Sequence, residues 1–339
     1  MYDLDKDLKD LPSRAAALTA RGARELDAPP PPDVQPRWDI PELVVLTAAI
    51  SGRVSREAAS GTPRSYPLDF GSFVQTSAEV IEAGAAGVHI DFGGIAAIQQ
   101  SGLSVPECYD KVISGIRAAT SHDWIPDCNV LRGQNFYENV YPITAGLTET
   151  VPMAPNFPVD WMESVATVSQ RHGVRVFFSI HSAAEVDLAN RYIYSRGLAG
   201  TPACWLILIG YQYDDATDRL AAYVAHPRAM LDELTLIVDR IREIDPQGFI
   251  QVCAAGRAGH YMATAAMLLG LHVRVGTEDS VWRYPHRDEL LQNNLEMVKR
   301  VRATAESLGR RLATPAEFRD MIGLAQPSAA GTASSAATR

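Results

Sequence analysis

Eight short apolar runs, separated by segments of helical periodicity, constrain the fold of this chain more than any other feature. The runs have the length and the β-branched content of buried strands. They span residues 43–50, 86–92, 124–131, 147–153, 174–181, 203–210, 249–256 and 272–276. Strands alternating with helices predict a parallel sheet, and eight such units favour a closed (β/α)8 TIM barrel. An open doubly wound sheet is the alternative, but the first turn, ISGRVSRE, lacks the glycine pattern G-x-G-x-x-G.

Helical patterns fill the segments between the runs. Apolar spacing predicts helices over 73–84, over 160–173 with Asp160 as N-cap, and over 289–309. Thr314 and Glu317 form a capping box that opens a last short helix.

The composition predicts an N-terminal extension with a proline-rich linker (1–40), a barrel catalytic domain (41–325) and a disordered tail (326–339). The net charge is −9 and there is no basic run, which argues against nucleic-acid binding. No apolar run is long enough to span a membrane, and the N-terminus lacks the apolar stretch of a signal peptide. The four cysteines are far apart in the sequence, which indicates reduced thiols in the core, so we expect a cytoplasmic protein.

Barrel enzymes carry their catalytic groups at the C-terminal ends of the strands. This rule selects ten polar residues: Arg53, His89, Asp91, Arg132, Glu149, His181, His260, Arg274, Glu278 and Asp279. Arg274 and Glu278 are both even-numbered, so an extended backbone would direct them to one face.

Three segments resemble the β-keto acid cleavage enzyme family, typified by 3-keto-5-aminohexanoate cleavage enzyme. They are EAGAAGVHIDF (82–92), GLHVRVGTEDS (270–280) and LGRRLATPAEFRDMIGL (308–324). The resemblance extends from about residue 43 to residue 324. It implies a C–C lyase or acyltransferase that exchanges a β-keto acid with acetyl-CoA, and a homo-oligomer, either a dimer or a tetramer.

The resemblance also implies a zinc ion held by two histidines and a glutamate. His89 matches the first histidine and Glu278 the glutamate, while Arg274 and Asp279 match residues for substrate binding and deprotonation. The chain departs from the family at the second histidine, which is Asp91.

Two further departures add guanidinium groups. Leu131-Arg132-Gly133 replaces a Thr/Ser-Thr-Gly-Gly segment, and Arg53 stands where the family has an acid.

His89, Asp91 and Glu278 therefore form the predicted metal site. One imidazole and two carboxylates make a harder donor set than two histidines, which suits Mn²⁺, Fe²⁺ or Mg²⁺ as well as Zn²⁺. His181 is a further candidate ligand or substrate-binding residue. The alternative is that Asp91 accepts a hydrogen bond from His89 or an arginine, and that no metal binds.

Arg53, Arg132 and Arg274 predict a small anionic substrate, a carboxylate or a dianion, bound through fork-like hydrogen bonds. The alternative is that Arg53 or Arg132 pairs with Asp91 or Glu149 and has no role in binding.

Three functions follow as hypotheses. The first is cleavage or formation of a C–C bond beside a carbonyl through a metal-stabilised enolate, with Asp279 or Asp91 as the base. The second is the standard exchange with acetyl-CoA. The sequence does not decide between them, and so does not show whether a CoA thioester is used. The third, of another class, is a non-catalytic binding protein on the same scaffold.

Overall fold

The computed structural model describes residues 36–51, 66–92, 100–210 and 226–326, together with the isolated positions 13, 16, 17, 19, 20, 95, 98, 213, 214, 219 and 220. The chain divides into two compact units, Met1–Asp39 and Ile40–Arg339. Arg53, most of the N-terminal extension and residues 327–339 lie outside the described residues.

Eight parallel strands close into a barrel, because the last of them in the chain pairs with both the seventh and the first. In chain order they are β2 (Leu46–Ala49), β3 (Gly87–Ile90), β4 (Ile125–Cys128), β5 (Thr150–Met153), β6 (Arg175–Ile180), β7 (Cys204–Ile209), β10 (Phe249–Ala254) and β11 (His272–Val275). Each strand lies within one of the eight apolar runs. The barrel prediction is confirmed, and closure excludes the open doubly wound sheet.

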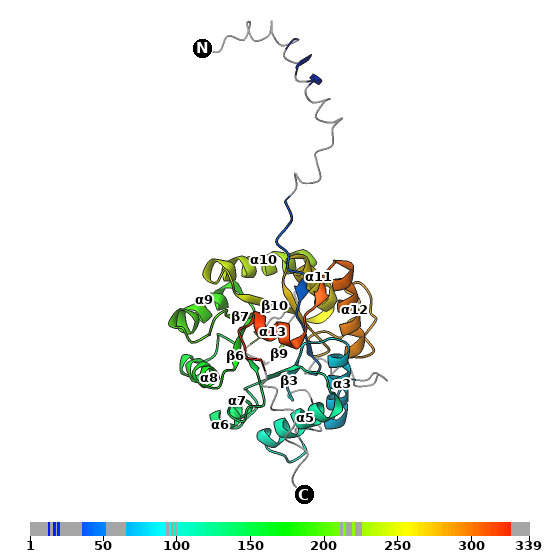
Figure 1. Cartoon of the computed structure of the whole chain (residues 1–339). Helices are drawn as coiled ribbons and strands as arrows, with labels where there is room; N and C mark the ends of the chain where they lie inside the picture. Colours follow the sequence, from blue (N-terminus) through cyan, green and yellow to red (C-terminus); the bar gives the residue numbers. More distant parts are fainter. Residues whose placement is uncertain are drawn as a thin grey trace. The chain divides into compact units, whose positions relative to one another are not determined.

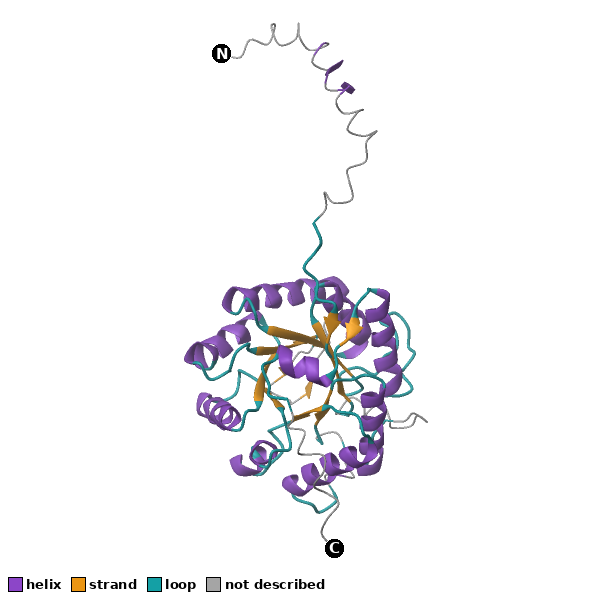
Figure 2. Cartoon of the chain, viewed as in Figure 1, coloured by secondary structure: helices purple, strands orange, loops and turns teal. Residues whose placement is uncertain are grey.

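Helices surround the strands (Figures 1 and 2). They are α3 (Phe70–Glu82), α5 (Val105–Ala119), α6 (Phe136–Asn139), α7 (Tyr141–Thr144), α8 (Val159–Arg171), α9 (Ala183–Tyr192), α10 (Pro227–Ile244), α11 (Gly259–Leu268), α12 (Asn294–Ser307) and α13 (Pro315–Met321). Short 3-10 turns, η2 (Tyr194–Arg196) and η3 (Gly256–Ala258), and two short strands, β8 (Tyr213–Asp214) and β9 (Arg219–Leu220), complete the connections between them.

Side chains close to the helix starts determine where several helices begin. The predicted capping box of Thr314 and Glu317 opens α13. Asp160 is not the N-cap of α8, because the helix already begins at Val159 and Asp160 lies in its first turn. Asn293 caps α12, so this helix starts five residues later than its apolar pattern predicts.

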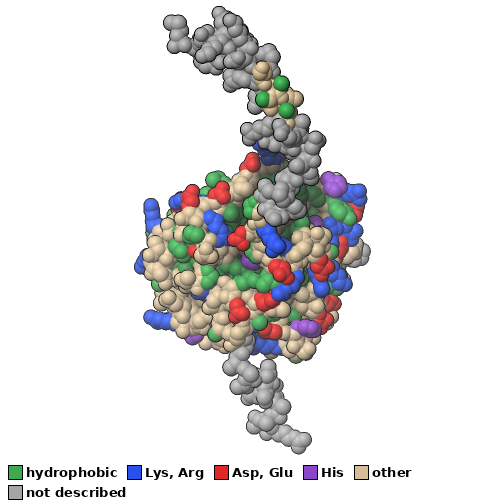
Figure 3. Space-filling model, turned by 45° about the horizontal axis from the view of Figure 1, so that its top comes forward, with side chains coloured by type: hydrophobic (Ala, Val, Ile, Leu, Met, Phe, Trp, Pro, Cys, Tyr) green, Lys and Arg blue, Asp and Glu red, His purple; other side chains and the backbone are tan. Residues whose placement is uncertain are grey.

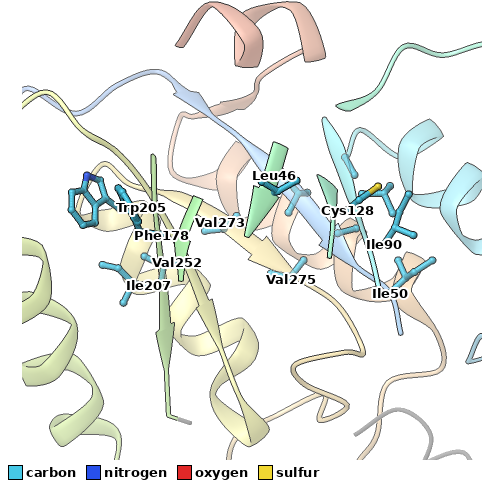
Figure 4. Packing of buried hydrophobic residues seen from close by; sticks show 14 of the residues in the cluster. Leu46, Ile50, Ile90, Cys128, Phe178, Trp205, Ile207, Val252, Val273 and Val275 are labelled. Atoms are coloured by element: carbon cyan, nitrogen blue, oxygen red, sulfur yellow. The ribbon is translucent and has the colours of Figure 1, made fainter. Parts of the chain in front are cut away.

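Successive residues of each strand point to opposite sides of the barrel wall, so their side chains belong to two different cores. Outward-facing side chains such as Leu46, Ile90 and Val273 belong to the core between strands and helices (Figure 4). Inward-facing side chains such as Phe177 and Phe249 belong to a second core, inside the barrel.

Helix α13 closes the N-terminal end of the barrel, and Figure 1 shows it across the centre of the ring. Its Phe318 ring stacks on Phe249, with centroids 5.4 Å apart. The strand β1 (Leu43–Val44) pairs with β12 (Arg311–Leu312) beside this helix. Only the C-terminal end of the barrel is therefore left for a site built from strand ends.

Arg319 of α13 is buried and donates hydrogen bonds to Asp123 and Glu149. Glu149 directly precedes β5, so it lies at the N-terminal end of its strand. The expectation that Glu149 belongs to the strand ends that form the site is wrong, because Glu149 lies before the first residue of its strand and the site is built from the C-terminal strand ends.

On the face shown in Figure 3, acidic and basic side chains are interspersed. Among the described residues, no helix combines the length and the apolar character needed to cross a membrane.

Candidate metal and active site

Three predicted residues meet at the C-terminal end of the barrel. His89 is on β3, Asp91 follows that strand, and Glu278 follows β11. One potential ligand atom from each of the three lies within 4.8 Å of the others. The structure thus brings together the donor set that the sequence predicts.

A turn at Gly276 places Glu278 in this group. Gly276 has φ 150°, and a Cβ atom there would lie 2.0 Å from the carbonyl oxygen of Ala49. The amides of Asp279 and Ser280 donate to the Gly276 carbonyl, so the backbone does not stay extended after β11. Arg274 and Glu278 still meet, but because of this turn and not because of strand alternation. Only glycine fits the position.

Asp127 of the neighbouring strand β4 contacts the imidazole of His89. The distance from His89 Nδ1 to Asp127 Oδ2 is 2.7 Å, and His89 Nε2 lies 3.7 Å from Glu278 Oε1. Burial lowers the pKa of His89, but the negative charges of Glu278 and Asp127 outweigh burial and raise it above its ordinary value. Burial raises the pKa of Asp127, and the neighbouring His89 and Arg274 more than offset this, so that it is lowered.

Asp91 is bound by two other side chains. Arg132 donates to both carboxylate oxygens, at 2.7 Å and 2.6 Å, and Asn129 donates to Oδ2 at 3.0 Å. The hydrogen bonds from Arg132 to Asp91 raise the pKa of the guanidinium. Arg132 therefore pairs with Asp91, one of the two arrangements that the sequence left open, while 42% of its side chain stays exposed.

Arg274 binds the other two acids. It donates to both oxygens of Asp279, at 3.0 Å and 3.2 Å, and to Glu278 Oε1 at 3.0 Å. Burial raises the pKa of Glu278 to about 7, against the opposing influence of His89 and Arg274. The second carboxylate oxygen of Glu278, Oε2, is buried and accepts no hydrogen bond from any described residue.

His89 belongs to a cluster with six charged side chains. They are four carboxylates and two guanidiniums, from Asp91, Asp127, Glu278, Asp279, Arg132 and Arg274. With a neutral imidazole and all four carboxylates ionised, the described residues carry two more negative than positive charges here. Unbalanced buried charge is costly. A divalent cation would balance the charge and give Glu278 Oε2 a partner, so the residues present fit such an ion.

The structure does not bring every predicted residue into this group. His181 directly follows β6, but its Nδ1 lies 3.2 Å from Glu185 Oε2, and it is not among the described residues that could share a metal with His89. His260 lies in the first turn of α11, with Nε2 3.3 Å from Thr304 Oγ1 of α12, so it packs between helices. The position of Arg53 cannot be compared, since it lies outside the described residues.

Asp127 and Asn129 are the site residues that the sequence analysis missed. They lie two residues apart in the apolar run WIPDCNVL, so both point into the barrel. Two polar side chains at that spacing in a buried strand are the signal that could have identified them.

A (β/α)8 barrel with a candidate metal site at its C-terminal strand ends is the class that this fold and site define. A family model described as beta-keto acid cleavage enzyme matches residues 43–324, and the chain belongs to this family.

Curated relatives match shorter stretches. The 3-keto-5-aminohexanoate cleavage enzyme of Acetoanaerobium sticklandii is 29% identical over 156 residues, which cover 46% of this chain and 50% of the relative. The enzyme of the same name from Fusobacterium nucleatum is 44% identical over 73 residues, or 22% of this chain and 26% of the relative.

The 3,5-dioxohexanoate:acetyl-CoA acetone transferase of Paraburkholderia graminis is 28% identical over 163 residues, covering 48% of each chain. The matches thus span between a quarter and a half of the relatives' length.

Solved structures of ObcA share the fold. The binary complex with oxaloacetate has a TM-score of 0.60 at 20% identity, covering 77% of this chain and 68% of ObcA. The ternary complex with a C4-CoA adduct and oxalate has a TM-score of 0.62 at the same identity and coverage. At this identity the likeness establishes the barrel alone.

Proposed function

We propose that this protein is a divergent, metal-dependent member of the family that breaks or forms a C–C bond beside a carbonyl group in a small carboxylate. The observation that carries the proposal is the meeting of His89, Asp91 and Glu278 around an excess of buried negative charge. A non-catalytic binding protein would not need to maintain this charge at the strand ends of a barrel.

His89, Asp91 and Glu278 would hold the cation, through one imidazole nitrogen and carboxylate oxygens. Such a set accepts Zn²⁺ and also suits Mn²⁺ or Fe²⁺. A bound divalent ion polarises a carbonyl oxygen and stabilises the negative charge that develops on it.

The remaining charged residues have separate roles in this proposal. Arg274 orients the carboxylate of the substrate, as the family resemblance implies. The partly exposed guanidinium of Arg132 attracts a second anionic group to the site. We assign proton abstraction to Asp279, because it matches the family's aspartate and because Asp91 would serve as a metal ligand.

Metal analysis tests the centre directly. Protein purified without chelators should contain about one divalent ion per chain, and Glu278→Gln or His89→Ala should lose it. Glu185→Gln is a matched control at the same end of the barrel, because Glu185 contacts His181 and lies outside the donor group. Trace metal in the wild type, with activity retained in both ligand variants, would refute the metal centre. Trace metal without activity would favour the non-catalytic binding protein.

Standard exchange with acetyl-CoA is the second candidate. The Paraburkholderia graminis relative, which is named an acetyl-CoA acetone transferase, favours it. The wild type should be assayed with simple β-keto acids and with dicarboxylic or phosphorylated analogues, each with and without CoA thioesters. We expect little product from the standard pair, because Asp91 and Arg132 alter the charge near the reacting atoms. Robust acyl-CoA formation from a monoanionic keto acid would instead restore the ordinary family reaction.

The resemblance also leads us to propose a homo-oligomer, a dimer or tetramer. Light scattering at micromolar concentration would test this, and a monomeric mass would contradict it.

A further inference from the structure

A mostly buried carboxylate, Asp127, lies beside His89 on the neighbouring strand, inside the barrel. The strand register aligns His89 with Asp127 and Asp127 with Thr150, so three adjacent strands place these side chains in one row. Asp127 Oδ2 contacts His89 Nδ1 at 2.7 Å, and Thr150 Oγ1 donates to Asp127 Oδ1 at 2.9 Å. The row therefore runs from a neutral hydroxyl, through a carboxylate, to the imidazole.

This arrangement determines which nitrogen of His89 is available. A carboxylate can only accept, so the proton of a neutral imidazole lies on Nδ1, and Nε2 keeps its lone pair. The separation of 3.7 Å between His89 Nε2 and Glu278 Oε1 is too long for a hydrogen bond. Two acceptor atoms thus face each other across a gap that a cation would bridge.

We infer that Asp127 is a positioning residue, which fixes the tautomer and ring orientation of His89, and that Thr150 in turn orients Asp127. The inference rests on the proposed function for its metal-dependent consequence, and on geometry alone for the tautomer. Carboxylates that orient a metal-binding histidine change metal affinity by about 10- to 100-fold.

The first test measures the affinity of the purified protein for Zn²⁺ and Mn²⁺ by competition with a chromophoric chelator. Asp127→Asn should weaken binding by about 10- to 100-fold, because the amide can donate to Nδ1 and so favour the wrong tautomer. Thr150→Val should have a smaller effect that Thr150→Ser restores. Thr47→Val is the matched control, since Thr47 is also buried inside the barrel but contacts Gln251.

The second test reads the tautomer without metal. Long-range ¹H–¹⁵N spectra of metal-free protein, at a pH where the ring is neutral, should place the proton of His89 on Nδ1. In Asp127→Asn this preference should weaken or reverse. Thr150→Val, which keeps the carboxylate, provides a second variant if Asp127→Asn does not fold.

The outcomes separate the two proposals. Wild-type metal affinity in Asp127→Asn would overturn the positioning role and leave the metal centre standing. If the wild type binds no metal but the tautomer changes in Asp127→Asn, the proposed function fails and the positioning role holds. An unchanged tautomer without metal binding would overturn both.

Discussion

The two ends of the barrel both hold a buried arginine among carboxylates, yet they differ in how far those carboxylates are exposed to water. At the N-terminal end, Arg319 bridges Asp123 and Glu149, and 51% and 28% of those acidic side chains are exposed to water. At the C-terminal end, Arg274 binds Glu278 and Asp279, which are only 16% and 2% exposed. Surplus negative charge is solvated at the first end and enclosed at the second.

This difference distinguishes a structural network from a ligand site. Water can solvate the acids around Arg319, so that network needs no further partner. Around Arg274 the surplus charge is shielded from water and one oxygen of Glu278 accepts no hydrogen bond from the described residues. Removing a charge should therefore affect stability at the N-terminal end and ligand binding at the C-terminal end.

Arg319→Met should have the largest effect. Removing one partner of a buried ion pair costs about 3–5 kcal/mol, and the exposure of the two acids places this case near the lower limit. Urea unfolding should show the loss, while metal content should not change. Arg311→Met is the control at the same end, because Arg311 is half exposed and solvent screens its ion pair with Glu317, so the loss of stability should be much smaller. Equal losses in both variants would contradict the contrast between buried and exposed pairs.

The sequence predicts the elements of the fold better than it predicts the contacts of the site. Strand runs and the Thr314 capping box depend on neighbouring residues, and local patterns therefore predicted them. Glu149 was wrongly assigned to the site, because it precedes its strand and lies at the N-terminal end of the barrel.

At the site, the sequence predicts His89, Asp91 and Glu278 as a group, because strand ends of a barrel converge. It does not predict that Asp127 holds His89, since that contact depends on the register between β3 and β4. The sequence also does not predict whether Arg132 pairs with Asp91 or remains available to bind the substrate, because this depends on the path of a loop.

Arg274→Lys should give the next largest effect, at the open end. Lysine keeps the positive charge but loses the planar fork that binds a carboxylate through two hydrogen bonds. Binding of a small carboxylate substrate should weaken by about 10- to 100-fold, measured by calorimetry on metal-loaded protein. Unfolding in urea provides the check on stability. Unchanged affinity would show that Arg274 serves only to hold Glu278 and Asp279.

His272 allows a further test of the comparison, because the free energy of unfolding should depend on pH through this residue. It starts β11, accepts a hydrogen bond from the Val45 amide through Nδ1, and stacks on Phe249 near the closed end. Burial, with the nearby positive charges of Arg310 and Arg242, lowers the pKa of His272 to about 3.

Below pH 6.5 the unfolded chain therefore binds a proton at this position that the folded chain excludes. The free energy of unfolding should fall with pH from 6.5 toward 3, by up to about 1.4 kcal/mol per pH unit. His272→Gln should reduce this slope between pH 6.5 and 5, whereas the same change at the exposed His286 should not. Parallel slopes for wild type and His272→Gln would show that other groups cause the acid sensitivity.

Thr314→Ala should have the smallest effect, because the residue it changes is a helix cap and not a buried charge. Thr314 Oγ1 accepts from the Glu317 amide at 3.2 Å, and the Glu317 carboxylate accepts from the Thr314 amide at 2.8 Å. Losing the first bond should cost about 1 kcal/mol of unfolding free energy. Thr314→Ser keeps the hydroxyl and should recover most of this loss. Since α13 closes the barrel at the end opposite the proposed metal site, metal affinity should stay at the wild-type value in both variants. A weakened metal site in Thr314→Ala would mean that the two ends are energetically coupled, and that the division between a structural and a functional end is too simple.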